Sequence, residues 1–325
     1  MRRWWLSLAL LLVVMPARAQ TKPVPAQVDD NVIRLTTDLV VVDTQVVAQA
    51  SGKIIGGLKA GDFIVEEDGV KQELSFFAQD KLPLSVVLLF DLTDTVQPVL
   101  KELAKGALQS LQHFKPEDEL AVLVYAQQVQ TLQGFTRERA PVAAAIEQAS
   151  TLHELHQLAL FNEALFQASE YLHANAAPRT RRLILWLTDN LPNKPPKSAH
   201  TEDEAFTQLF EHDIAVFGLT LQSAEGKVYG FFELLSGGKK GAGDIFKYAE
   251  RTGGEVVKAE KENVDQRLAE IIDHVRARYT LGYVSTNMSA APGFRRLRVR
   301  VTPAVEKREG KVVLRGKAGY FAKAK

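Results

Sequence analysis

The 325-residue chain contains no cysteine. This absence excludes a disulfide framework, a lipid-modified N-terminal cysteine and a cysteine nucleophile. Long hydrophobic runs are almost as scarce, because the apolar stretch Leu6–Met15 is too short to span a bilayer comfortably and no later run is longer. Basic residues are not in excess, since the formal net charge is only +1. Without a basic excess to neutralise phosphates, nucleic acid is not expected as a partner.

The first residues predict a secretory signal peptide. Two arginines open the chain, the apolar run Leu6–Met15 follows, and Ala17-Arg18-Ala19 has the small-x-small pattern of a cleavage site. We therefore expect residues 1–19 to be removed, which lowers the formal net charge to −2 because three arginines leave with them. The mature protein is then expected to be extracytoplasmic, secreted or periplasmic, without a transmembrane segment. An uncleaved membrane anchor is the alternative, which the short run and a proline beside the cleavage site disfavour.

The rest of the chain divides into segments of different pattern. Residues 20–31, rich in proline, glutamine and aspartate, predict a linker. Short β-branched segments separated by turns predict strands over residues 32–80, and strands return over residues 279–325. Between them, residues 81–278 alternate apolar strands with helical spacing, which is typical of a doubly wound, mostly parallel α/β sheet. Neither flank alone has enough strands for a stable β layer, so we predict this α/β domain to be inserted in a discontinuous β-sandwich built from both flanks.

One stretch of the α/β region, Leu84–Thr95, combines a buried strand with polar side chains. Its continuous apolar run predicts a strand covered on both faces, which leaves Asp91, Thr93 and Thr95 at the carboxyl end. A later apolar strand ends in Thr188-Asp189-Asn190 in the same way. Ligands of open α/β sheets bind at this edge, so both groups of side chains are candidates for recognition or chemistry.

These two strand ends resemble the von Willebrand factor type A domain, in which a first strand ends in Asp-x-Ser-x-Ser and a later strand ends in an aspartate. Nearly the whole mature chain also resembles the secreted von Willebrand factor A-related family known from Acidobacteria. That wider resemblance rests on four motifs in the flanks, namely Gly57-Leu58-x-x-x-Asp62-Phe63-x-x-x-Glu67-Asp68-Gly69, Arg278-Tyr279-x-Leu281-Gly282-Tyr283, Phe294-Arg295-x-Leu297-x-Val299 and Gly319-Tyr320-Phe321.

The resemblance implies a metal-ion-dependent adhesion site. Asp91 would bind Mg²⁺ or another divalent cation through its carboxylate or a water, Thr93 and Thr95 would supply hydroxyl oxygens, and Asp189 would act through water. Hard cations of this kind require oxygen ligands. With few carboxylates around it, the ion stays electrophilic enough to accept an acidic group from a partner.

The sequence departs from the family pattern at one ligand position. The family's middle loop supplies a threonine, and Ala159 stands at that place, so an expected oxygen is missing. Asp94 or a water molecule is the candidate to fill the gap. Occupation of the site by an ion therefore stays open at this point.

The function implied by the resemblance is an exported, non-enzymatic protein-binding or adhesion module that recognises a protein partner at the carboxyl edge of its α/β sheet. Partner contacts are expected from Asp91, Asp94, Asp189 and Asn190, with the loop Pro192–His200 shaping the choice of partner. The alternative is a metal-independent structural or assembly protein of the cell envelope. An enzyme comes third, because no serine lies in a Gly-x-Ser-x-Gly elbow.

Four other features have a functional and a structural interpretation. The histidines of His153–His156 are three residues apart, whereas the metalloprotease motif needs four, so surface residues are the preferred interpretation. The glycines and lysines of 237–241 lack the spacing of a phosphate-binding loop. The acidic run Glu66–Asp68 leads into an Asp-Gly turn and predicts a hairpin tip rather than a metal cluster. The arginines 296, 298 and 300 share one strand face, for which an exposed sandwich face is preferred over a basic binding stripe.

Overall fold

The fold is described by a computed structural model that covers residues 39–79, 82–126, 128–152, 160–191, 200–222, 244–287 and 293–322. The predicted signal peptide (1–19) and linker (20–31) lie outside the described residues, as do Ala159, His153–His156 and the glycine-rich segment 237–241. No helix in the described ranges is long and apolar enough to cross a membrane.

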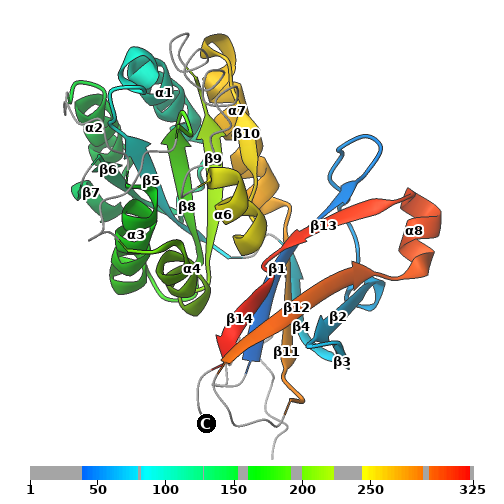
Figure 1. The fold of residues 1–325 in the computed structure, drawn as a ribbon. Helices are drawn as coiled ribbons and strands as arrows, with labels where there is room; N and C mark the ends of the chain where they lie inside the picture. Colours follow the sequence, from blue (N-terminus) through cyan, green and yellow to red (C-terminus); the bar gives the residue numbers. More distant parts are fainter. Residues whose placement is uncertain are drawn as a thin grey trace, which may run out of the picture. The chain divides into compact units, whose positions relative to one another are not determined.

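The α/β part of the chain is built on a six-stranded sheet. Its strands are β5 (Leu84–Asp91), β6 (Glu119–Tyr125), β7 (Val129–Thr136), β8 (Arg181–Thr188), β9 (Ile214–Thr220) and β10 (Val256–Lys258). They follow the order β10-β9-β8-β5-β6-β7, and every pair is parallel except β6 with β7 (Figure 1). Every residue of β5 is buried, as its uninterrupted apolar run predicts.

Helices cover both faces of this sheet (Figure 1). They are α1 (Gln97–Ser110), α2 (Arg139–Ala149), α3 (Phe161–Asn175), α4 (Glu202–Glu211), α6 (Ile245–Thr252) and α7 (Val264–Arg276), with short 3₁₀ turns at Leu111–His113 and Lys261–Asn263. Helices α1, α2 and α7 share one hydrophobic core with the sheet, whereas α3, α4 and α6 share the other. The predicted doubly wound α/β fold is confirmed.

The two flanks of the chain form antiparallel sheets together. Their elements are β1 (Leu39–Ala48), a 3₁₀ turn (Ala60–Asp62), β2 (Phe63–Glu67), β3 (Val70–Gln72), β4 (Leu74–Gln79), β11 (Tyr279–Val284), β12 (Gly293–Val301), α8 (Pro303–Glu309), β13 (Val312–Gly316) and β14 (Gly319–Ala322). The sheet orders are β13-β1-β11-β4 and β14-β12-β2-β3, so each sheet mixes strands from both flanks. Their apolar side chains share one core.

Two connections between consecutive strands pass from one sheet to the other. Strand β3 pairs with β2, whereas β4, which begins two residues later, pairs with β11 in the other sheet. Likewise, β13 pairs with β1, whereas β14 pairs with β12. A chain that passes from one sheet of a sandwich to the other must bend away from the strand with which it first forms hydrogen bonds. Alternation along the sequence continues through such a bend and does not reveal it.

Tyr279 joins the sandwich core to the connection between β1 and β2. Its hydroxyl donates a hydrogen bond to the Ile55 carbonyl at 2.9 Å and accepts one from the Leu58 N–H at 3.0 Å. Its ring centroid lies 5.0 Å from that of Phe63 and 5.9 Å from that of Phe77. The side chain therefore satisfies two buried backbone groups within an aromatic cluster.

Tyr279→Phe is expected to lower the free energy of unfolding by about 1–3 kcal/mol, because two buried backbone groups lose their partner. Urea unfolding measures the change. Tyr320→Phe is a matched control, since this half-buried residue donates a hydrogen bond of 3.1 Å to Glu67, whose carboxylate keeps the hydroxyls of Tyr283 and Ser285 as donors, so the loss should be smaller. A loss at Tyr279 no larger than that at Tyr320 would contradict the assignment.

Candidate functional site

The two predicted aspartates lie at the carboxyl ends of neighbouring strands, Asp91 at the end of β5 and Asp189 directly after β8. From β5 the chain continues to β6 on one side of the sheet, whereas β8, β9 and β10 lie on the other side. The strand order therefore reverses between β5 and β8. In open α/β sheets, ligands bind in the crevice at such a reversal.

The Asp91 carboxylate is fully buried and accepts four hydrogen bonds. Oδ1 accepts from the N–H of Thr93 at 3.0 Å and from its hydroxyl at 2.7 Å. Oδ2 accepts from the hydroxyls of Tyr125 at 2.8 Å and Thr188 at 2.6 Å. Burial raises the pKa of Asp91, while these hydrogen bonds act in the opposite direction. The four donors fix the carboxylate in one orientation.

Tyr125 and Trp186 are linked to Asp91 by two consecutive hydrogen bonds. The Trp186 indole N–H donates to the Tyr125 hydroxyl at 2.8 Å, and that hydroxyl donates to Asp91. Burial and the negative charge of Asp91 raise the pKa of Tyr125, so the phenol stays protonated as a donor. The sequence interpretation missed Tyr125. No sequence signal identifies it, because its contact with Asp91 arises from the register of β6 against β5.

Asp189 has one satisfied and one unsatisfied oxygen. Its Oδ1 accepts the N–H of Leu191 at 3.0 Å, whereas Oδ2 is buried and has no hydrogen-bond partner among the residues described. Burial raises the pKa of Asp189 to about 7, and the charge of Asp91 contributes in the same direction. Interactions with Thr95 and the Leu191 backbone lower it by less. The site therefore holds two buried carboxylates that destabilise each other's negative charge.

The other predicted site residues differ in what they can contribute. Thr93 and Thr95 lie together, with 3.4 Å between their hydroxyl oxygens. Asp94 is half-buried, and its Oδ1 lacks a hydrogen-bond partner in the described part of the chain. Asn190 has its side chain engaged with the start of α6, since its Oδ1 accepts the N–H of Ile245 at 3.1 Å. Asn190 therefore links β8 to α6.

Direct contact between a partner and the two aspartates is prevented by burial, because Asp91 and Asp189 are both 0 % exposed. A partner could reach these carboxylates only through an ion or a water molecule that bridges them. Of the loop predicted to shape partner choice, residues 192–199 lie outside the described part of the chain. The next residue, His200, is hydrogen-bonded to Glu163, with 2.7 Å between its Nδ1 and Oε2 of Glu163.

The donor set is suited in part to a divalent cation. Over the described ranges, no group of three or more His, Cys, Asp or Glu side chains could hold a metal ion. Carboxylate and hydroxyl oxygens are the ligands that Mg²⁺ prefers, and the unsatisfied oxygens of Asp189 and Asp94 have unused acceptor capacity. Asp91 fits less well, because its four lone-pair positions are all occupied and it must release a hydrogen bond to bind an ion directly.

Comparison with known proteins identifies a sequence family over the α/β region. Residues 86–191 match the family described as von Willebrand factor type A domain. No curated protein matches the chain.

Solved structures with detectable similarity include the conserved hypothetical protein BatB from Bacteroides thetaiotaomicron, at 15% identity over 59% of this chain and 98% of that chain, with a TM-score of 0.43. The PilB minor pilin from Streptococcus sanguinis is 12% identical over 62% of this chain and 63% of its own, with a TM-score of 0.42. A von Willebrand factor type A protein from Catenulispora acidiphila is 11% identical over 88% of this chain and 73% of its own, with a TM-score of 0.43.

Proposed function

We propose, from the match of residues 86–191 to the von Willebrand factor type A family, that the protein is an exported, non-enzymatic protein-binding module. It recognises a protein partner at the carboxyl edge of the α/β sheet through Mg²⁺ or another divalent cation. The observation that carries the proposal is the pair of buried carboxylates, Asp91 and Asp189, at the point where the strand order reverses.

In this mechanism the protein would contribute oxygen ligands to the cation. Thr93, Thr95 and Asp189 would hold the cation, with Asp94 in place of the missing threonine, and Asp91 would orient Thr93 through the hydrogen bonds to its Oδ1. The Leu191 N–H fixes one oxygen of Asp189 and leaves the other available. When bound, the cation compensates the two buried negative charges and supplies a Lewis-acidic position for an acidic group of the partner.

Millimolar Mg²⁺ is expected to raise the melting temperature, because a ligand of the native state stabilises it by about 2.7 kcal/mol at a hundredfold excess over Kd. Thr93→Val should lose most of this shift, since it removes a hydroxyl from the site and keeps the side-chain volume. Thr207→Val is the matched control, because among the residues described its hydroxyl bonds only the Asp203 carbonyl on α4. Calorimetric unfolding of the three proteins with and without chelator measures the shifts.

No shift of the wild type with Mg²⁺ or Mn²⁺, or equal shifts in both variants, would contradict the metal-dependent function. The partner step has its own test in capture from cell-envelope extract, with chelator added to one of two parallel samples. A partner retained equally in both samples would show that recognition does not need the ion.

A second candidate is favoured by the hydrogen bonds of Asp91. Because its carboxylate is satisfied by three side chains and one backbone N–H, the site is complete at that position without an ion. Under this hypothesis the domain is a metal-independent structural or assembly protein, and Asp91 holds the ends of β5, β6 and β8 together. Asp91→Ala would then lower stability equally with and without Mg²⁺, which separates the two functions.

A further inference from the structure

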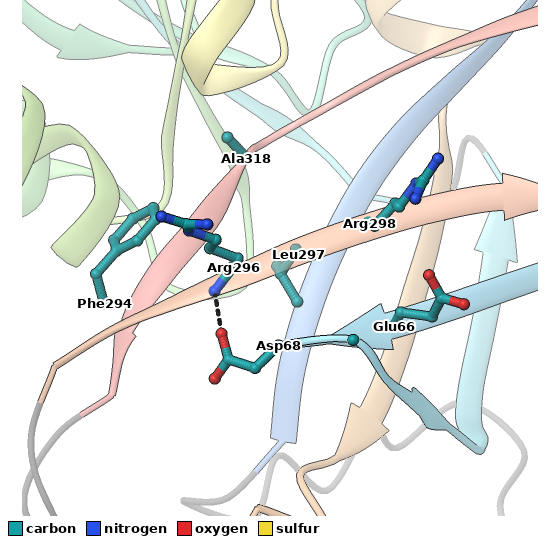
Figure 2. A pocket seen from close by; sticks show the side chains of 8 residues that line it. Glu66, Asp68, Phe294, Arg296, Leu297, Arg298 and Ala318 are labelled. Atoms are coloured by element: carbon teal, nitrogen blue, oxygen red, sulfur yellow. Dashed lines mark hydrogen bonds between the residues drawn. The ribbon is translucent and has the colours of Figure 1, made fainter.

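A cavity of about 680 Å³ opens on the β-sandwich, separate in sequence from the α/β sheet edge. Its volume lies within the range of roughly 300–1,000 Å³ that is usual for ligand pockets. The lining comes from the β2–β3 hairpin, from β12 and from the link between β13 and β14 (Figure 2); its charged and aromatic residues are Glu66, Asp68, Phe294, Arg296 and Arg298.

Both carboxylates of this cavity are already engaged. Glu66 forms an ion pair with Arg300, two residues beyond the cavity on β12. Asp68 accepts the backbone N–H of Arg296 at 2.9 Å (Figure 2) and pairs with Arg295 at 3.4 Å. Neither carboxylate is therefore available as a full partner for a further cation.

Two arginines of the cavity remain without such partners. The side chains of Arg296 and Arg298 are exposed, and within the described ranges neither takes part in an ion pair or a side-chain hydrogen bond. Lys71 lies opposite Glu66 in the β2–β3 register and adds a positive charge beside them. Arg296, Arg298 and Arg300 of β12 and Lys71 of β3 thus outnumber the two carboxylates of the hairpin, and the surface carries an excess of positive charge.

The spacing of these groups matches an extended chain. Arg296 and Arg298 are two residues apart on β12, so their side chains leave the same face about 7 Å apart. Alternate side chains of an extended peptide repeat at the same distance. Phe294 continues this face by two more residues; its ring packs edge-on against Phe321, and the residue is still 38% exposed. The cavity therefore offers two cationic positions and one aromatic position on one face of β12.

We infer that this cavity, the Arg296–Arg298 groove, binds an extended acidic segment of a partner protein. Carboxylates at alternate positions of the segment pair with the two guanidinium groups, and an apolar side chain packs on Phe294. Arginine suits this role because its planar guanidinium binds a carboxylate through two parallel hydrogen bonds. The assignment is independent of the metal site, because every lining residue belongs to the β-sandwich.

The test uses fluorescence anisotropy with the mature full chain in EDTA, which silences the proposed cation site. The probe is a fluorescein-labelled peptide in which glutamate alternates with threonine. Comparison peptides carry lysine in place of glutamate, or place the same glutamates next to one another. We expect the alternating acidic peptide to bind most tightly, and its binding to weaken as NaCl rises.

The variant Arg296→Glu with Arg298→Glu should weaken binding at least tenfold, and Arg296→Gln with Arg298→Gln should also weaken it without reversing the charge. Lys101→Glu with Lys105→Glu is the matched control, because it makes the same charge change on exposed positions of α1 and should leave Kd unchanged. Urea unfolding verifies that each variant is folded.

Equal loss in the α1 control would assign binding to net charge alone and overturn the inference. Equal affinity for the two arrangements of glutamate would overturn the extended geometry, and absence of binding by the wild type would overturn the groove itself. Because all titrations contain EDTA, these outcomes are independent of whether Mg²⁺ stabilises the α/β domain.

Discussion

Asp189→Asn is expected to stabilise the metal-free protein above pH 7 and to abolish its response to Mg²⁺. Asp189 is fully buried, and burial together with the charge of Asp91 raises its pKa to about 7. Ionisation of this carboxylate in the folded protein is therefore costly. Asparagine keeps an acceptor for the N–H of Leu191 and removes the charge.

The direction of the pH dependence follows from proton linkage. The unfolded chain releases the Asp189 proton near its ordinary pKa of 3.8, whereas the folded protein keeps it until about pH 7. Stability is therefore highest at low pH as far as this group is concerned, and it falls as pH rises from about 4 to about 7. Asparagine does not titrate, so the variant and the wild type should diverge over that interval. The difference above pH 7 should be on the order of 4 kcal/mol, at roughly 1.4 kcal/mol for each of the ~3 pKa units between 3.8 and about 7.

Urea unfolding in EDTA between pH 4 and pH 8.5 measures this divergence. Asp203→Asn controls for the change in net charge, since it removes a carboxylate from the exposed first turn of α4. Millimolar Mg²⁺ should narrow the difference at pH 8, because the wild type gains a stabilising ligand and the variant does not. A variant that is less stable than the wild type at pH 8 in EDTA would contradict the buried, repelled carboxylate.

Much of the α/β fold and the placement of its aspartates could be predicted from the sequence. The apolar run before Asp91 and the one before Thr188 each identify a buried parallel strand from composition alone. Because parallel strands end at the same edge, Asp91 and Asp189 could be assigned to one site without knowledge of their neighbours. The match of residues 86–191 to the von Willebrand factor type A family confirms the resemblance that these strand ends suggested.

The partners of Asp91 could not be predicted, because they depend on register between strands distant in sequence. Tyr125 can donate to Asp91 because the register of β6 against β5 places these two residues side by side. The ion pairs around the Arg296–Arg298 groove could not be predicted either. Arg298 is opposite Glu66 in the register, yet the ion pair of Glu66 is with Arg300, so register alone does not determine the pairing of long side chains.

Gly254 lies against the backbone of β9, the neighbour of the strand that leads to Asp189. It follows the left-handed Gly253 that ends α6, and its N–H donates to the Ala249 carbonyl at 2.7 Å. A Cβ atom at Gly254 would lie 1.8 Å from the Val216 carbonyl oxygen and 2.7 Å from its carbon. Both atoms belong to the backbone of β9, so no side-chain rotation can relieve the overlap.

Gly254→Ala is therefore expected to lower the free energy of unfolding by more than about 3 kcal/mol, or to prevent accumulation of soluble protein. The added methyl forces β9 away from α6, and β9 pairs with β8, the strand that carries Asp189 at its end. The Leu221 N–H also donates to the Thr188 carbonyl at 3.1 Å, so the displacement reaches the strand end of the site. Gly61→Ala is the matched control, because a Cβ there meets no atom of the described ranges within 4 Å and should leave stability nearly unchanged. Urea unfolding of both variants decides the matter, and equal stabilities would show that β9 and α6 can separate without cost.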